Sequence, residues 1–485
     1  MTFRKKTVTS LKWSGLENGF RFMFSFVISI VLARLLSPED FGLVAMVSIF
    51  IALSRTLIDG GFGDSLIRKV DCKDEDYNTI FTFNIILSVV LYLLLFLSAP
   101  LISDFFNVKA VKQIIRITGL GMVISSFSIV QVAVLRKNLE FKKQAIISFV
   151  TTIVSGLVSI FLALYGFSYW SLIIPAIITA FVNSFLLWYY SKWRPIFKLN
   201  FSILREHFVF GSKIMFSSLI LNLGNNVYTA FIGKLFSPLQ LGYFSRADNI
   251  QKLPSSNLDN MVRHITYPLL ASISNEESNL ISKFKLILSY TAFINTTIML
   301  LLYLISEDLI IILYGVKWIN SLVYLKILCF AGIFQPLTSI NANLLNVKGK
   351  SDYTLYALLI NLLLTIPVVY VGFVFGLLQM TYCVLIAAII YYLVMAYLVA
   401  TKSTLFFISQ IRMTIKIFFL PFSTFLLTII TVKYFDYIFY KNLFMKINIF
   451  IFYFSVIGYL FKNAYLLEAL LYIKKIEFLK RLNFK

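Results

Sequence analysis

The sequence has 485 residues, of which 59% are hydrophobic and only 14% are charged. A water-soluble globule carries about a quarter charged residues, so this composition excludes that class. The formal net charge of +22 comes from short basic clusters between apolar segments, which is typical of membrane topology and not of nucleic-acid binding, so no nucleic-acid partner is expected.

Apolar segments recur along the chain, each long enough to cross a hydrocarbon core, which takes roughly 20 residues. The first follows Gly15 and lacks a small-residue cleavage site, so it is predicted to be a spanning helix and not a signal peptide. The sequence thus predicts an all-α polytopic membrane protein. Its fourteen predicted transmembrane helices lie at 14–36, 41–63, 79–100, 113–135, 145–166, 169–191, 210–235, 241–270, 286–305, 322–346, 353–375, 379–400, 413–432 and 446–461.

The eighth of these segments, Leu241 to Leu270, is the least apolar and fails on hydropathy alone. It is included because of the internal repeat described below. Its titratable residues are Arg246, Asp248, Lys252, Asp259, Arg263 and His264.

Lysine and arginine concentrate in every second loop along the chain. The loops on the N-terminal side are basic, as at 68–73, 136–143 and 192–205, whereas the opposite loops are nearly bare. Because basic loops stay in the cytoplasm, and fourteen spans return the chain to its starting side, both termini are predicted to be cytoplasmic, with a basic C-terminal tail. Only Lys433, Lys441 and Lys446 depart from the pattern.

An internal repeat appears at an offset of about 200 residues. Residues 33–42 (ARLLSPEDFG) match 233–242 (GKLFSPLQLG), and Asp59 falls in register with Asp259. Ser-Pro predicts a helix stop and restart, because proline disfavours helical geometry in the residue before it and suits the first turn of the next helix. The repeat predicts a six-helix lobe at 1–200, a second at 201–401, and two extra helices with the tail at 402–485.

Charged and amide side chains concentrate in the first two spans of each predicted lobe, and such residues usually face a water-filled cavity or a partner. Symmetry predicts that these spans surround one polar, net cationic cleft. Several charged pairs are four residues apart and so share a helical face; a plain neutralising ion pair is the alternative for each. The residues are Glu17, Asn18, Arg21, Arg55, Asp59, Asp64, Asn222, Asn225, Asn226, Lys234 and those of the eighth segment.

Arg55 and Arg246 are the strongest candidates for an anion site, since a guanidinium stays charged and donates two parallel hydrogen bonds to phosphate. Asn222, Asn225 and Asn226 are candidates for polar cavity lining. No Walker, GxSxG or HExxH motif occurs, and the three cysteines and two histidines form no metal-ligand spacing. No cofactor, no metal and no enzymatic activity are expected.

The segment 32–42 (LARLLSPEDFG), followed by Asp59-Gly60-Gly61-Phe62-Gly63, resembles the signature of Wzx-type polysaccharide flippases in the multidrug/oligosaccharidyl-lipid/polysaccharide (MOP, MATE-like) exporter superfamily. Residues 241–247 (LGYFSRA), Pro268 and the extra pair of spans are similar to the WzxC-like lipopolysaccharide-biosynthesis branch. The resemblance covers roughly residues 10–400.

The resemblance implies two six-helix lobes in a V around a central cationic cavity, in a bacterial inner membrane. It implies transfer of undecaprenyl-pyrophosphate-linked oligosaccharide to the periplasmic leaflet by alternating access, for lipopolysaccharide O-antigen, capsule or exopolysaccharide. The lipid bilayer, a polysaccharide polymerase and glycosyltransferases are the implied partners. By position, the implied pyrophosphate ligands are Arg21, Arg55, Arg246 and Arg263.

Two other functions stay open. A cation-coupled drug exporter of the same superfamily would favour an acidic cavity, and a membrane glycan polymerase or ligase would favour a large outward loop, which the sequence lacks. Asp59 and Asp259 are candidate proton carriers, although the membrane potential acting on a charged cavity would also drive transport.

Overall fold

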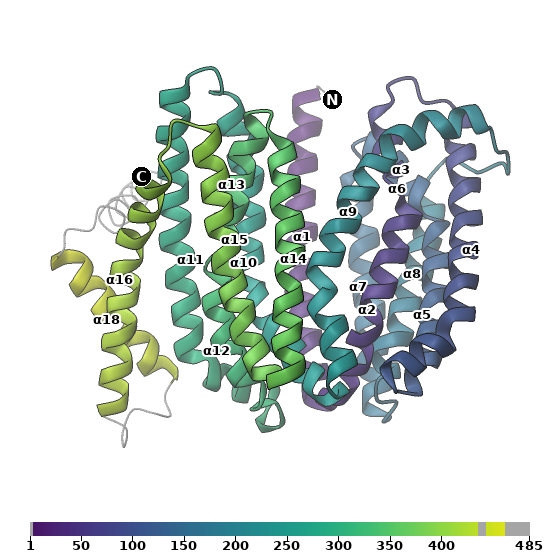
Figure 1. Cartoon of the computed structure of the whole chain (residues 1–485). Helices are drawn as coiled ribbons and strands as arrows, with labels where there is room; N and C mark the ends of the chain where they lie inside the picture. Colours follow the sequence, from purple (N-terminus) through teal and green to yellow (C-terminus); the bar gives the residue numbers. More distant parts are fainter. Residues whose placement is uncertain (1–2, 435–442, 461–485) are drawn as a thin grey trace, which may run out of the picture. The chain divides into compact units, whose positions relative to one another are not determined.

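The computed structural model describes residues 3–434 and 443–460, and within them every regular element is a helix (Figure 1). Lys441, the basic tail and the last residue of the predicted span 446–461 lie outside the described residues. The helices are α1 (Phe3–Leu35), α2 (Pro38–Asp59), α3 (Phe62–Arg68), α4 (Asp74–Phe106), α5 (Ala110–Ser126), α6 (Ile129–Lys137), α7 (Phe141–Leu164), α8 (Trp170–Tyr190), α9 (Phe201–Leu235), α10 (Pro238–Ala271), α11 (Glu277–Tyr314), the 3-10 turn η1 (Val316–Trp318), α12 (Ser321–Gly332), α13 (Gln335–Val347), α14 (Ser351–Phe375), α15 (Leu377–Lys402), α16 (Phe407–Tyr434) and α18 (Leu443–Leu460).

Each predicted span coincides with one helix or with two helices in succession. In the described part of the chain, eleven of these segments are long and apolar enough to cross a bilayer, and α18 is a shorter apolar helix. The eighth predicted segment is confirmed as helical, because α10 runs unbroken for 34 residues. That α9 and α10 cross the membrane stays a prediction, as does the count of fourteen.

The Ser-Pro motif ends one helix and starts the next in both copies of the repeat, as predicted. α1 ends at Leu35 and α2 begins at Pro38, while α9 ends at Leu235 and α10 begins at Pro238. In the first copy the hydroxyl of Ser37 accepts from the Asp40 N–H (3.2 Å) and the Asp40 carboxylate accepts from the Ser37 N–H (2.8 Å). This reciprocal cap satisfies backbone donors that the first turn leaves open.

The two copies of the motif also lie against each other. A β-carbon added at Gly42 would overlap the carbonyl oxygen of Pro238, and one added at Gly242 would overlap the carbonyl oxygen of Pro38. Only glycine permits so close an approach of two backbones. The contact is reciprocal, so the start of α2 and the start of α10 meet in the same way from both sides.

The chain folds as two compact units that divide after Ser245, inside α10. In the first unit α7 packs on α1 and α8, and α5 packs on α4, α8 and α2 (Figure 1). α9 belongs to this unit because it packs along α2, α3 and α4. The lobes predicted to end at residues 200 and 401 come from the sequence repeat and not from packing, and they stay a prediction.

A buried polar cluster fastens the start of α9 to α3 and α4. The two ring nitrogens of His207 bridge the hydroxyl of Ser65 (2.7 Å) and the carboxylate of Asp76 (3.0 Å). Lys69 donates to Asp76 (2.7 Å) and to Glu206 (2.9 Å), and its hydrogen bond to Asp76 raises the pKa of Lys69 above its ordinary value. The cluster therefore ties helices that are far apart in the sequence.

In the second unit α15 packs on α12, α13 and α14, and α16 packs on α11 and α18 (Figure 1). Phe284 and Leu288 of α11 and Leu337 and Ile340 of α13 lie in its buried apolar core. Lys446 of α18, which broke the predicted charge alternation, forms an ion pair with Asp308 of α11 at 2.6 Å. Of the three exceptions to the charge pattern, Lys446 is therefore part of a buried pair and is not a loop charge.

We expect Gly42→Ala to lower the apparent unfolding temperature of the purified protein, since overpacking costs about 1–3 kcal/mol and the obstructing atoms belong to the backbone. Gly19→Ala is the matched control, because a β-carbon at this helical position meets no atom within 4 Å; it should be neutral or slightly stabilising. Equal unfolding temperatures for the two variants would contradict the close contact.

Candidate functional site

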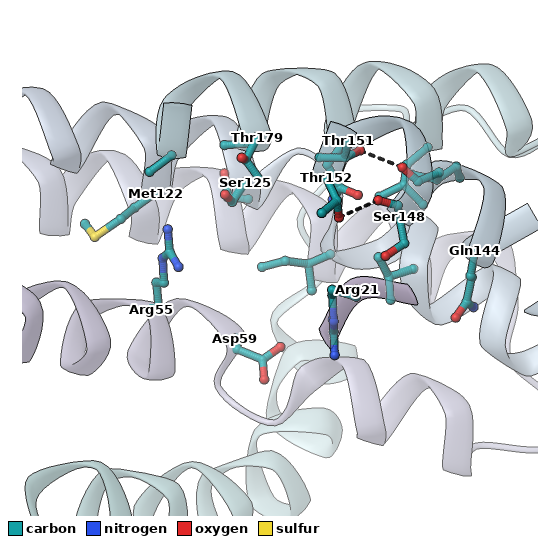
Figure 2. A pocket seen from close by; sticks show the side chains of 18 of the residues that line it. Arg21, Arg55, Asp59, Met122, Ser125, Gln144, Ser148, Thr151, Thr152 and Thr179 are labelled. Carbon is teal, nitrogen blue, oxygen red and sulfur yellow. Dashed lines mark hydrogen bonds between the residues drawn. The ribbon is translucent and has the colours of Figure 1, made fainter. Parts of the chain in front are cut away.

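A cavity of about 520 Å³ lies inside the first unit, surrounded by α1, α2, α5, α6, α7 and α8 (Figure 2). This volume falls in the range of ligand pockets, about 300–1,000 Å³. Its polar lining residues are Glu17, Arg21, Arg55, Asp59, Ser125, Ser126, Arg136, Gln144, Ser148, Thr151, Thr152, Thr179 and Asn183.

The charges of this cavity come from α1, α2 and α6. Arg21 comes from α1, Arg55 and Asp59 from α2, Arg136 from the last turn of α6, and Glu17 from α1. Three arginines against two acids leave one net positive charge. Figure 2 shows Arg55 reaching from α2 toward Met122 and Ser125, with Asp59 one turn further along the same helix.

The carboxylates do not neutralise these arginines in direct pairs. Among the described residues no ion pair joins Arg55 to Asp59 or Arg21 to Glu17, although each pair is four residues apart. Arg21 instead donates to the amide oxygen of Asn18 at 3.2 Å. The guanidinium groups of Arg55 and Arg21 are therefore open to an anion in the cavity. A direct pair would have occupied the hydrogen-bond donors that phosphate needs.

The opposite side is neutral and rich in hydroxyl groups. α7 supplies Ser148, Thr151 and Thr152, and α8 supplies Thr179 and Asn183. Figure 2 shows Ser148, Thr151, Thr152 and Thr179 across the cavity from α2.

Two parts of this lining were missed from the sequence. Arg136 was counted among the cytoplasmic loop charges, but α6 places it in the cavity. The spans that became α7 and α8 carry almost no charge, and the sequence search, which looked for charged and amide side chains in the first two spans of each lobe, did not register their hydroxyls. A hydroxyl pattern at helical spacing, such as Ser148, Thr151 and Thr152, is the signal that would have found this side.

The candidate residues on α10 lie in the second unit. Arg263 donates to Asp259 at 3.1 Å and to the hydroxyl of Ser339 at 3.0 Å, so the structure forms the charged pair predicted by their spacing. Arg246 is only 5% exposed, and its guanidinium lies over the rings of Tyr314 (4.8 Å) and Trp318 (5.0 Å). Aromatic faces attract a cation and hold this one in place.

The asparagines of α9 are in the first unit but do not line the cavity described above. Asn222 donates to the hydroxyl of Thr56 on α2 at 2.8 Å, and Asn226 donates to the Asn222 carbonyl at 2.9 Å. The side chain of Asn225 lies outside the described part of the structure. Thus Arg21, Arg55 and Asp59 come together in one cavity, and the pyrophosphate and ion-coupling roles of all these residues stay predictions.

The sequence matches the model of one protein family. The family described as polysaccharide biosynthesis protein matches residues 31–323, more than half of the chain. The chain belongs to this family. The matched range contains Arg55, Asp59, Arg136 and the whole hydroxyl side, and Arg21 lies shortly before it.

Two curated relatives carry related names. The lipopolysaccharide biosynthesis protein WzxC of Escherichia coli (strain K12) is 26% identical over 378 residues, covering 77% of this chain and 76% of WzxC. The teichuronic acid biosynthesis protein TuaB of Bacillus subtilis (strain 168) is 24% identical over 355 residues, covering 73% of each chain. The resemblance to the Wzx-type proteins is therefore confirmed.

Solved structures show the fold of this membrane protein. The lipid II flippase MurJ in an inward closed conformation matches with a TM-score of 0.72 at 16% identity, over 94% of this chain and 99% of MurJ. An inward-facing multidrug resistance MATE family transporter of the MOP superfamily matches with a TM-score of 0.63 at 14% identity, over 79% and 95%. The chain is thus a multi-pass helical membrane protein with a MurJ- and MATE-like fold.

We expect the cavity to be wet, which cysteine labelling tests in a variant without Cys72, Cys329 and Cys383. Thr179→Cys should react with a charged, water-soluble thiol reagent, because the thiolate forms only where water reaches it. Phe181→Cys on the same helix should stay unlabelled, since Phe181 is 61% exposed on the apolar outer surface and does not line this cavity. Equal labelling of both positions would rule out a separate aqueous cavity.

Proposed function

We propose that the protein is a flippase that moves undecaprenyl-pyrophosphate-linked oligosaccharide from the cytoplasmic to the periplasmic leaflet, for a cell-surface polysaccharide such as lipopolysaccharide O-antigen, capsule or exopolysaccharide. The observation that carries the proposal is the gathering of Arg21, Arg55 and Arg136 in one cavity of a polysaccharide-biosynthesis family member. WzxC is named for lipopolysaccharide biosynthesis, TuaB for teichuronic acid biosynthesis, and MurJ as a lipid II flippase.

The arginines suit the pyrophosphate on physical grounds. A charged side chain in a span is costly unless water or a counter-charge reaches it, and the cavity lined by these arginines carries one net positive charge. A pyrophosphate bound here accepts paired hydrogen bonds from Arg21 and Arg55, and Arg136 adds a third cation from the end of α6. Arg246 and Arg263 are proposed as ligands in the second half of the transport path.

Alternating access needs two lobes that approach and part. The repeat predicts such lobes, at 1–200 and 201–401, arranged as a V of fourteen spans around a central cationic cavity with both termini cytoplasmic. The reciprocal contact of Gly42 with Pro238 and of Gly242 with Pro38 is the natural place for the outward side to close.

Asp59 and Asp259 are proposed as proton carriers that couple transport to an ion gradient. Asp59 lines the cavity beside the arginines, and Asp259 holds Arg263. Binding an anionic substrate near Asp59 favours protonation of that carboxyl, because a second negative charge nearby disfavours its ionised form. A polysaccharide polymerase and glycosyltransferases are the proposed partner proteins in the inner membrane.

We predict that Arg55→Ala abolishes polymer export at normal expression, with at least a tenfold fall in transport, because a hydrogen bond to a charged group contributes about 1.5–3 kcal/mol. Arg55→Lys keeps the charge but loses the paired donors, so it should retain partial activity. Surface polysaccharide in a strain carrying only the variant is the measurement.

Arg116→Ala is the matched control for Arg55→Ala. Arg116 is an arginine of α5 that lies over the ring of Phe96 at 4.1 Å and is not part of the cavity lining. Its loss should leave export close to the wild-type level. Normal export by an Arg55→Ala, Arg136→Ala double variant would overturn the anion site.

A further inference from the structure

A second hollow lies on the outer surface of the first unit, between α5 and α8, with a volume of about 540 Å³. We call it the outer groove. Phe185 and Tyr189 in its wall are 63% and 73% exposed, and α8 is long and apolar enough to cross a bilayer. The outer groove therefore faces lipid. Its lining residues are Ile124, Phe127, Phe181, Ser184, Phe185, Trp188, Tyr189 and Arg194.

The helix α8 lines both the outer groove and the inner cavity, with different faces. Thr179 and Asn183 line the cavity, whereas Phe181 and Phe185 line the outer groove. The two members of each pair are four residues apart, so each pair shares one face of the helix. The outer groove is thus a separate hollow behind the cavity wall.

The polar groups in the floor of the outer groove satisfy one another. The hydroxyl of Ser184 donates to the carbonyl oxygen of Ile124 at 2.9 Å, and the indole of Trp188 donates to the carbonyl oxygen of Phe127 at 2.8 Å. Both carbonyls lie where α5 ends, and a helix end leaves carbonyls without a helical partner. With these groups paired, the floor presents apolar surface to the membrane.

Arg194 lies in the loop that follows α8 and lines the same groove. Its Nη1 donates to the carbonyl oxygens of Ser191 and Trp193, and the ring of Trp193 packs against Phe81 of α4 with ring centroids 5.8 Å apart. The loop is therefore fixed to the helices. Among the described residues, neither Nε nor Nη2 of Arg194 has a hydrogen-bond partner, so both are available to an anion.

The chemistry of the outer groove changes along α8. Phe181 and Phe185 come first, Trp188 and Tyr189 follow, and Arg194 comes after the helix end. At 1.5 Å per residue, Phe181 and Tyr189 are about 12 Å apart along the helix. Tryptophan and tyrosine favour the headgroup level of a bilayer, and a guanidinium donates paired hydrogen bonds to phosphate. A phospholipid has the same order of acyl chain, glycerol and phosphate.

The charge of the outer groove favours an anionic headgroup. Its lining contains no carboxylate, and Lys192 is exposed two residues before Arg194. Two neighbouring cations attract a headgroup with a net negative charge, whereas they repel the ammonium group of a zwitterionic headgroup.

We infer that the outer groove binds an anionic glycerophospholipid, with one acyl chain along Phe181 and Phe185 and the phosphate on Arg194. The groove is separate from the cavity that holds Arg21 and Arg55. The bound phospholipid is therefore a second ligand of the protein, and this inference does not depend on which lipid is transported.

Native mass spectrometry of the full-length protein in detergent tests this site. The probes are phosphatidylglycerol and phosphatidylcholine with identical acyl chains, and the affinity of the first bound lipid is measured for each. We expect phosphatidylglycerol to bind about tenfold more tightly than phosphatidylcholine. Arg194→Gln should weaken phosphatidylglycerol by about tenfold, because it removes the charge and the paired donors.

Arg205→Gln is the matched control for Arg194→Gln. Arg205 is an exposed arginine at the start of α9 that does not line the groove. Its substitution changes the net charge equally, so it should leave the binding of phosphatidylglycerol unchanged. An unchanged unfolding temperature for both variants shows that they are folded.

The acyl-chain part of the site has its own variant. Phe181→Ala, Phe185→Ala should weaken phosphatidylglycerol several-fold, because it removes apolar contact surface. Phe373→Ala, Phe375→Ala is the control, since these phenylalanines of α14 are 71% and 62% exposed and lie outside the groove; it should bind as the wild type does.

Three results would each overturn the inference. The first is an equal loss of phosphatidylglycerol binding in Arg194→Gln and Arg205→Gln, which would show a general effect of charge. The second is displacement of phosphatidylglycerol by equimolar glycerol 3-phosphate, which would show a site for free anions. The third is tighter, Arg194-dependent binding of undecaprenyl pyrophosphate than of phosphatidylglycerol, which would assign the groove to the transported lipid.

Discussion

The reciprocal contact between the two Ser-Pro-x-x-x-Gly segments sets the position of α2, on which the cavity depends. α2 begins at the cap of Ser37, meets α10 at Gly42, and carries Arg55 thirteen residues further on. At a rise of 1.5 Å per residue, that arginine lies about 20 Å along a continuous helix from the contact. Any tilt of α2 about Gly42 therefore moves Arg55 and Asp59 relative to α7 and α8.

The far end of α2 is also held. Gly60 and Gly61 take left-handed φ values of 52° and 69°, which lets the chain turn from α2 into α3 directly after Asp59. A β-carbon at Gly61 would press on the backbone of Gly211 in α9, and His207 joins α9 to α3 and α4. α2 is thus held near both of its ends by the α9–α10 segment. A change in that segment reaches the cavity through packed backbone, which transmits displacement because it cannot compress.

Much of the fold follows from local rules, and for that reason the sequence predicts it well. Apolar run length predicts the helices, and Ser37-Pro38 and Ser237-Pro238 predict their stops, because these effects act within one turn. Partners far apart along the chain follow no such rule. Tyr314 and Trp318 come some 70 residues after Arg246, and Asp308 precedes Lys446 by 138 residues. Only folding brings these groups together, so the aromatic contacts of Arg246 and the pairing of Lys446 had no sequence signal.

The residues that line the cavity differ from the residues that the internal repeat preserves. In register with the first copy, Asp59 corresponds to Asp259, but Arg55 corresponds to Ser255, which is fully buried and accepts from Gln251 at 2.8 Å. Asp59 lies in a cavity without a direct arginine partner, whereas Asp259 holds Arg263. The repeated residues are the Ser-Pro pairs that separate two helices and the glycines that contact the backbone of the other copy. The unrepeated ones, Arg55 above all, line the cavity of the first unit. The repeat therefore preserves a backbone contact, whereas Arg55 belongs to the arrangement of arginines and hydroxyls that lines the cavity of the first unit.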